Sequence, residues 1–111
     1  MKIIATYGRD HRLKPLDEAE VIGIIDRENG SITEKVNPGY MTSKEMAMSY
    51  ILRLGADAIV VKKGFLCPGS YAMSQGKIKY LVLDDDKTDS LINTLKASEP
   101  LDELNEELYE E

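Results

Sequence analysis

The chain has 111 residues, of which 42% are hydrophobic, so it suits one domain with an ordinary core and is too short for a second. Its apolar runs, such as residues 58–61, are far shorter than a membrane span, and we expect no membrane partner. The N-terminus has a single lysine before a short apolar run and lacks the hydrophobic region of a signal peptide, which predicts a cytoplasmic protein.

The net charge of −6 is concentrated at the C-terminus. Residues 101–111 contain six acidic and no basic side chains, and the rest of the chain holds 14 of each sign. Because nucleic-acid binding generally requires a surplus of positive charge, we expect no nucleic-acid partner. A local basic pocket is compatible with this balance.

Cysteine usage limits the metal and redox chemistry. Cys67 is the only cysteine, so it cannot form an internal disulfide or supply a cysteine-based zinc or iron-sulfur site alone. Three interpretations stay open at this point: a packed core thiol, a reactive thiol, or one metal ligand among several.

The first third of the chain predicts three strands. Residues 2–6 form an apolar strand that is followed by a loop to about residue 16. Two further strand patterns, 21–25 and 31–36, flank the Asn29-Gly30 turn signal and predict a β-hairpin over residues 20–36.

The rest of the chain alternates helices and strands. Thr42 and Glu45 have capping-box spacing ahead of an amphipathic helix that ends at Gly55. The remaining expected elements, in chain order, are a strand at 58–61, a helix at 69–75, a strand at 80–83 and a helix from about residue 88. The order βββαβαβα predicts an α/β domain over residues 1–98 with a five-stranded mixed sheet, followed by an acidic tail over residues 99–111.

The topology predicts where a ligand binds. A hairpin after a central first strand makes strands one, three, four and five parallel, so their carboxyl ends share one edge of the sheet. Open α/β sheets bind ligands at that edge. The segments gathered there are residues 7–11, 37–42, 62–70 and 84–86. Two predicted helix N-termini also face this edge, where their free N–H groups favour an anion.

Candidate ligand-binding residues come from these segments. Positive charge comes from Arg9, Lys62 and Lys63, Gly64 and Gly69 would let a ligand approach the backbone closely, and Cys67 would supply a thiolate and is the candidate metal ligand. His11 is a candidate ligand or proton carrier, although a solvated histidine is the simpler interpretation. The other candidates have simpler interpretations as well: the glycines as turn residues, the lysines as solvated side chains, and the cysteine as a packed core residue. The aspartates at 84–86 are most simply interpreted as helix-capping residues.

One stretch resembles a known family. Residues 54–61, followed by Gly64, Phe65, Pro68 and Gly69, resemble the dinitrogenase iron-molybdenum cofactor biosynthesis family, which includes NifX-type proteins and the C-terminal domain of NifB-type proteins. Residues 1–5, Asp26 and Asn37-Pro38 match as well, so the similarity covers roughly residues 1–95. The resemblance implies a three-layer α/β/α fold with a ribonuclease-H-like motif and adds Asn37 to the candidate cofactor-binding residues.

The resemblance also implies a function. We expect a non-enzymatic protein that binds or carries an anionic iron-sulfur or iron-molybdenum type cofactor, or its precursor. Cys67 stands where the family usually has a glycine, and the histidines common before strand two and after strand three are missing, which indicates a divergent member. The alternative is a protein–protein interaction module that uses the acidic tail. A metal-dependent nuclease is disfavoured because strand one carries no carboxylate. We expect a monomer, or a homodimer paired through an exposed third strand.

Overall fold

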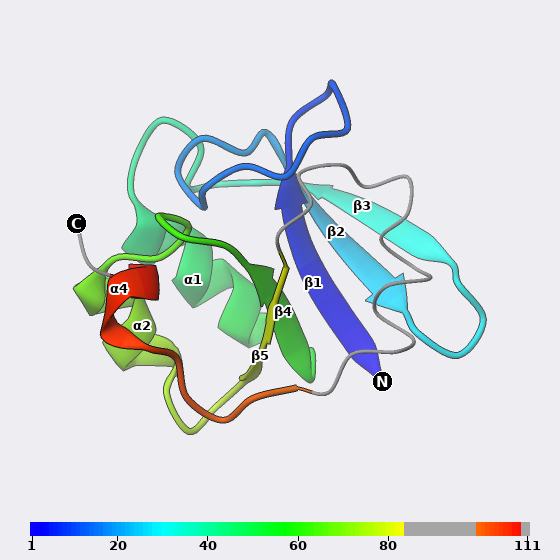
Figure 1. Cartoon of the computed structure of the whole chain (residues 1–111). Coiled ribbons are helices and arrows are strands. Elements are labelled where there is room, and N and C mark those ends of the chain that lie inside the picture. The colour runs from blue at the N-terminus through cyan, green and yellow to red at the C-terminus, as the bar shows by residue number, and fades with distance from the viewer. Residues whose placement is uncertain (84–99, 110–111) are drawn as a thin grey trace.

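The computed structural model describes residues 1–83 and 100–109. The elements in chain order are β1 (Lys2–Tyr7), β2 (Val21–Asp26), β3 (Ile32–Val36), α1 (Lys44–Arg53), β4 (Ala58–Val61), α2 (Pro68–Ser74), β5 (Lys79–Val82) and α4 (Glu106–Tyr109). The five strands form one sheet in the order β3-β2-β1-β4-β5 (Figure 1).

The sheet is mixed in the way the sequence predicts. β2 runs antiparallel to both β1 and β3, whereas β1, β4 and β5 are parallel to one another. This confirms the α/β class, the hairpin and the shared carboxyl-end edge of β1, β3, β4 and β5. The helix expected from about residue 88 and the aspartates at 84–86 lie outside the described residues.

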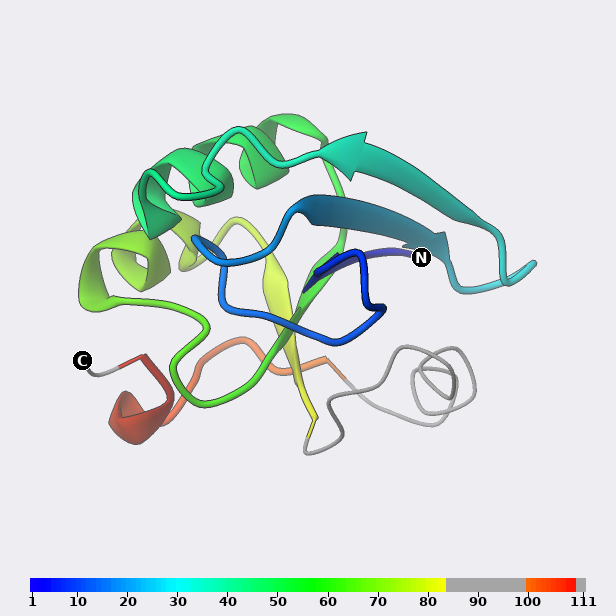
Figure 2. The same ribbon diagram turned by 90° about the horizontal axis from the view of Figure 1, so that it is seen from above.

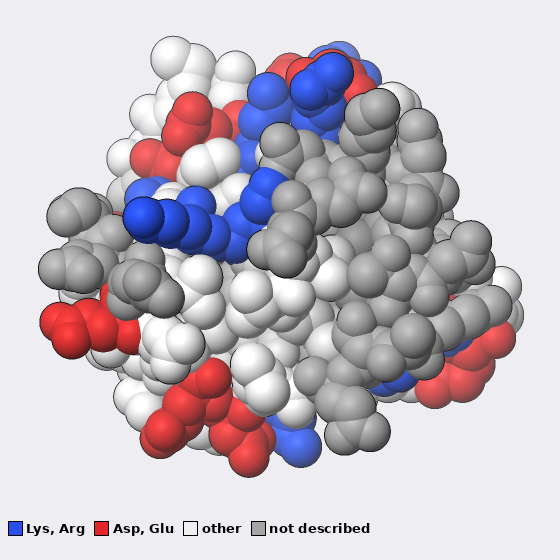
Figure 3. Space-filling view, in the orientation of Figure 1, with Lys and Arg blue, Asp and Glu red and all other residues white. Residues whose placement is uncertain are grey.

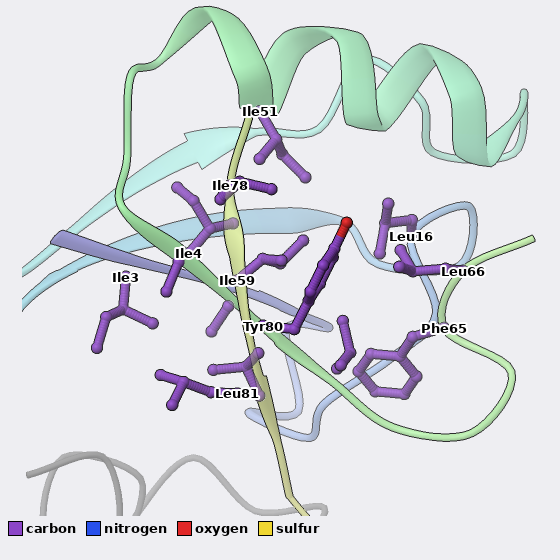
Figure 4. Packing of buried hydrophobic residues seen from close by; sticks show 14 of the residues in the cluster. Ile3, Ile4, Leu16, Ile51, Ile59, Phe65, Leu66, Ile78, Tyr80 and Leu81 are labelled. Atoms are coloured by element: carbon purple, nitrogen blue, oxygen red, sulfur yellow. The ribbon is translucent and has the colours of Figure 1, made fainter. Parts of the chain in front are cut away.

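The core lies on both faces of the central strand. Ile3 and Ile4, neighbours on β1, are both fully buried and point to opposite faces because side chains alternate along a strand. Ile4 lies on the face that α1 and α2 cover, together with Ile59 of β4 and Tyr80 of β5 (Figures 2 and 4). The three-layer prediction rests on the helix expected from about residue 88, which lies outside the described residues.

The two longer described helices begin in ways that differ slightly from the sequence prediction. α1 is capped by Ser43, whose Oγ accepts a hydrogen bond from the Met46 N–H at 3.0 Å. The predicted capping box of Thr42 and Glu45 is therefore one residue too early. Adjacent Thr and Ser are both good caps, and the chain uses the second. α2 begins at Pro68, one residue before the predicted start. None of the described helices is long and apolar enough to span a bilayer.

Residues 100–109 pack against the domain. Leu101 exchanges backbone hydrogen bonds of 2.7 and 2.8 Å with Tyr80 of β5 and so covers that edge of the sheet. Further along, Leu104 is only 9% exposed and its N–H donates to the Tyr71 hydroxyl at 3.1 Å. The Tyr109 ring stacks on the Tyr71 ring with centroids 4.1 Å apart. These contacts fix the described part of the acidic tail beside α2.

Candidate functional site

The loops at the carboxyl-end edge are tied together by one buried amide. Asn37 is 3% exposed, and its Nδ2 donates to the carbonyl oxygens of Leu16 at 2.7 Å and Ala19 at 2.8 Å. Its Oδ1 accepts from the Gly39 N–H at 2.9 Å. The structure therefore places this candidate residue inside the protein, where it joins the segment before β2 to the loop after β3.

The loop after β1 forms a small, well-bonded projection at this edge. Arg9, whose side chain is 83% exposed, donates from Nε to Glu20 at 2.9 Å. His11 is exposed, and its ring stacks on Tyr7 with centroids 6.3 Å apart. Its φ of 60° is in the left-handed region, and Met41, in the neighbouring loop after β3, has a φ of 58°. Non-glycine residues in this conformation cost about 1 kcal/mol or more and occur often in functional loops.

The loop after β4 presents two lysines from an anchored base. Phe65 and Leu66 are almost completely buried, and the Phe65 carbonyl accepts from the Leu16 N–H at 3.2 Å. A tight turn precedes them, in which the Phe65 N–H donates to the Lys62 carbonyl at 3.0 Å and Gly64 has a φ of 85°. A side chain at Gly64 would be strained by that φ, although nothing lies near its missing Cβ.

The loop after β4 carries basic side chains and no acidic ones. Residues 58–78 contain no Asp or Glu at all, and Lys63 is exposed with no ion pair among the described residues. Over the loop after β1, by contrast, Arg9 pairs with Glu20 and Lys14 pairs with Asp10 at 3.4 Å. In Figure 3, blue side chains lie over the loop after β4 with red side chains next to them, and blue and red are mixed over the loop after β1.

Cys67 is buried and hydrogen-bonded. Its Sγ donates to Oε1 of Glu45 at 2.9 Å, which is the main cause that lowers the pKa of the Glu45 carboxyl. Within α2 it forms a capping box with Ser70: the Ser70 N–H donates to Sγ at 3.4 Å, and the Cys67 N–H donates to the Ser70 Oγ at 2.9 Å. The thiol is thus held as a hydrogen-bond donor to the Glu45 carboxylate.

Glu45 is a site residue that the sequence prediction did not include. Its carboxylate lies so close to α2 that a Cβ on Gly69 would come within 2.8 Å of Oε1. The close approach expected at Gly69 is therefore made by Glu45 of α1. The only sequence signal was its place in the first turn of a helix, where acidic residues are common, and nothing local indicated that α2 would lie beside it.

Asp17 is a second carboxylate at this edge that was not a candidate. Its Oδ1 is buried and has no hydrogen-bond partner among the described residues, while its backbone carbonyl accepts from the Met41 N–H at 2.8 Å. Nothing in residues 1–83 and 100–109 assembles three or more His, Cys, Asp or Glu side chains in a geometry that could hold a metal ion.

The helix N-termini at this edge are largely occupied by protein groups. Ser43 caps α1, and Cys67 with Ser70 caps α2, which also has Pro68 without an N–H at its first position. We expected an anionic ligand at these helix N-termini. At the start of α2 the Glu45 carboxylate lies in that position instead, beside Cys67 and Gly69. The exposed Lys63, more than the helix ends, is the group available to an anionic ligand here.

A cavity of about 800 Å³ lies at the opposite, amino-end edge of the sheet. It is lined by the C-terminal ends of α1 and α2 and by Asp102 and Glu103 of the tail. Because the C-terminal end of a helix carries partial negative charge, this cavity is the less suitable place for an anion. The size of the cavity makes it a candidate ligand site, but the charge of its surroundings makes the carboxyl-end edge the better site for an anionic ligand.

Comparison with known proteins supports the fold. The solved structures similar to the chain include one from Methanocaldococcus jannaschii, provisionally named as a dinitrogenase, and one from Thermotoga, provisionally named as a NifB protein of the DUF35 family. The first has a TM-score of 0.68 at 16% identity and covers 94% of this chain and 97% of its own. The second has a TM-score of 0.65 at 13% identity and covers 94% of this chain and 96% of its own. At these identities the likeness establishes a NifX/NifB-like fold.

Sequence comparison adds one curated relative. An uncharacterised ATP-binding protein from Pyrococcus abyssi is 30% identical over 81 residues, which is 73% of this chain and 23% of the relative. The chain thus spans about a quarter of the length of the curated relative it matches. No protein-family model matches the sequence.

Proposed function

We propose that this chain is a non-enzymatic binding or carrier domain that receives an anionic cofactor of iron-sulfur or iron-molybdenum type, or its precursor, at the carboxyl-end edge of its sheet. The observation that carries the proposal is the loop after β4, where Lys62 and Lys63 stand on an anchored base in a stretch without acidic residues. The NifX/NifB-like fold supports the class of ligand. Within this proposal the chain is a divergent member of the cofactor biosynthesis family.

The side chains at this edge limit how such a cargo would be held. A cluster that depends on several protein thiolates does not fit, because Cys67 is the only cysteine and its thiol is bonded to Glu45. A cluster that keeps its own ligands and its negative charge fits better, since the exposed Lys63 attracts it without being a ligand. Cys67 would become a ligand only after losing its proton and after Glu45 turns away.

The absence of a catalytic role is part of the proposal. A thiol nucleophile needs a neighbouring base, and among the described residues the partner of Cys67 is a carboxylate that already accepts its proton in a hydrogen bond. The only imidazole of the chain belongs to His11, whose ring lies over Tyr7 in the loop after β1.

ATP binding, which the name of the Pyrococcus relative states, is left out of the proposal. The segment of this chain that comes nearest to a phosphate-binding loop is Gly64–Ser70, which follows β4 and runs into the first turn of α2 but has no lysine before the serine. Three of its backbone donors are also in use: the N–H groups of Phe65, Cys67 and Ser70 are bonded within the loop and cap, and Pro68 has no N–H.

Anaerobic reconstitution tests the proposal. The protein is incubated with iron and sulfide, and bound iron, molybdenum and zinc are measured together with visible absorption for wild type and for Cys67→Ser, which keeps a side chain able to cap α2. We expect wild type to bind iron and the variant to retain most of it if charge holds the cargo. Iron lost entirely on substitution makes Cys67 an essential ligand, and no iron in either protein contradicts the carrier function.

The alternative function is an interaction module that uses the acidic tail. The observation in its favour is that the contacts of Leu101, Leu104 and Tyr109 fix the tail while leaving Asp102, Glu103 and Glu106 exposed. Deleting the tail would remove the core contacts of Leu101 and Leu104 and could destabilise the domain itself. The test therefore replaces Glu103 and Glu106 with Gln, which removes the charges and keeps these contacts. Unchanged partner capture by that double variant would exclude the tail as the binding surface.

A further inference from the structure

The two outer strands of the sheet differ in exposure. β5 is covered by Leu101, whereas all five residues of β3 are exposed and no described residue pairs with its outer side. Two of the exposed residues are apolar: Ile32 is 44% exposed and Val36 is 83% exposed. An uncovered edge with apolar side chains is a template for a further strand.

The register of the hairpin fixes which backbone groups β3 presents outward. Ser31 and Asn37 bond to β2, through the Asp26 N–H to the Ser31 carbonyl at 2.9 Å and the Asn37 N–H to the Glu20 carbonyl at 3.1 Å. Because bonding alternates along an antiparallel strand, Thr33 and Lys35 also face β2. The N–H and C=O groups of Ile32, Glu34 and Val36 therefore point away from the sheet.

We propose that β3 is a self-association edge, where two copies of the chain pair antiparallel about a two-fold axis at Glu34. In this register Glu34 lies opposite Glu34 of the second copy, and each Ile32 lies opposite a Val36. The outward-facing backbone groups of Ile32, Glu34 and Val36 in one copy then lie opposite those of Val36, Glu34 and Ile32 in the other. This arrangement gives about six backbone hydrogen bonds between the two copies. The same register covers both exposed apolar side chains, so hydrogen bonding and burial select one arrangement.

The central glutamates do not prevent this pairing, because each is drawn back over its own sheet. The Tyr7 hydroxyl donates to Glu34 Oε2 at 2.6 Å, and its ring reaches across Gly23, where a Cβ would come within 2.6 Å of the ring. Glu34 thus leans toward β1, two strands away from the open edge. This Tyr7–Glu34 bond separates the two carboxylates that a flat pairing would bring together.

Charge on the other face favours the same register. Lys35 of one copy lies opposite Thr33 of the other, and Thr33 borders a hollow of about 290 Å³ that Asp26 also lines, together with Lys2, Ile24 and Ser31. The long lysine side chain can cover this hollow and bring its ammonium group toward the Asp26 carboxylate. A peptide strand from an unrelated partner would lack this two-fold match.

Molecular mass in solution tests the proposal on the full chain. We expect wild type to sediment as a dimer at about 100 µM. Val36→Lys places a charge opposite Ile32 and should weaken the dimer at least about tenfold. Met41→Lys is the matched control, because Met41 is 82% exposed and lies outside β3, and it should leave the dimer unchanged. A monomeric wild type, or equal effects of the two variants, overturns the proposal.

Cross-linking tests the register independently of affinity. In a Cys67→Ser background, Glu34→Cys should form an intermolecular disulfide on mild oxidation, because opposite residues of an antiparallel pair lie about 5.5 Å apart, within disulfide reach. Lys35→Cys should not, since residue 35 lies opposite residue 33. Cross-linking at 35 and not at 34 overturns the two-fold register.

Discussion

The two ends of the sheet differ in what holds them and in the charge they present. At the carboxyl end, loops are joined by buried hydrogen bonds from Asn37 and by the buried side chains of Phe65 and Leu66, and the exposed Lys63 projects from them. At the amino end, two helix C-termini and the docked tail surround an open cavity. The end of the sheet that holds the cavity is therefore the less suitable one for an anion.

The largest expected effect on stability comes from the buried hydrogen bonds of Asn37 at the carboxyl end of the sheet. Asn37→Ala leaves the buried carbonyls of Leu16 and Ala19 without their donors and should lower the free energy of unfolding by about 3 kcal/mol, measured by urea denaturation. Asn29→Ala is the control, because its side chain makes one exposed bond, to the Ser31 N–H, and should cost less than about 1 kcal/mol. Equal losses would mean that Asn37 does not hold the loops together.

A smaller loss is expected at the amino end. Leu104→Ala removes the buried apolar contact of the tail and should cost about 2 kcal/mol in the same assay. Leu101, by comparison, is 48% exposed, and Leu101→Ala should cost well under half of that because its backbone bonds to Tyr80 remain. A tail that contributes nothing to stability would show no difference between these variants and wild type.

The next effect concerns the reactivity of Cys67. Glu45→Gln removes the carboxylate that accepts the thiol proton, so alkylation of Cys67 in the folded protein should become several-fold faster, up to about tenfold. Glu18→Gln, another exposed carboxylate at the same edge, should leave the rate unchanged. A slower or unaltered rate in Glu45→Gln would show that the Glu45 carboxylate does not protect the thiol.

The smallest effect is a pH dependence from the same pair. The hydrogen bond from Cys67 lowers the pKa of Glu45 below its ordinary value of 4.5, so folding favours the ionised carboxylate. This stabilisation is complete above the pKa of the unfolded chain and is lost as the pH falls through the lower folded value. Wild type should therefore lose its advantage over Glu45→Gln as the pH is lowered below 4.5, in urea denaturation at several pH values.

Local patterns predicted the elements better than the contacts between them. The Asn29-Gly30 turn and the alternation after it gave the hairpin, and from the hairpin followed the parallel strands and the shared edge. The capping prediction was one residue off because Thr42 and Ser43 are equally suitable caps. These are features that a few neighbouring residues decide.

The candidate site depended on contacts that no local pattern contains. Asn37 was expected to face a ligand, and the structure turns it toward residues about twenty positions earlier. Glu45 and Cys67 are 22 residues apart and meet only because α1 and α2 lie side by side. The loop after β4 was predictable, since its lysines and its lack of acids are properties of the sequence itself.

Binding of iron and sulfide to two matched charge variants tests the central claim most directly. Lys63→Glu and Lys77→Glu make the same change on exposed lysines, one in the loop after β4 and one at the amino-end cavity. After anaerobic reconstitution, we predict that Lys63→Glu loses at least about tenfold in affinity for the iron-sulfur cargo and that Lys77→Glu binds like wild type. Equal binding by both variants, or loss only in Lys77→Glu, would contradict an anion site at the carboxyl-end edge.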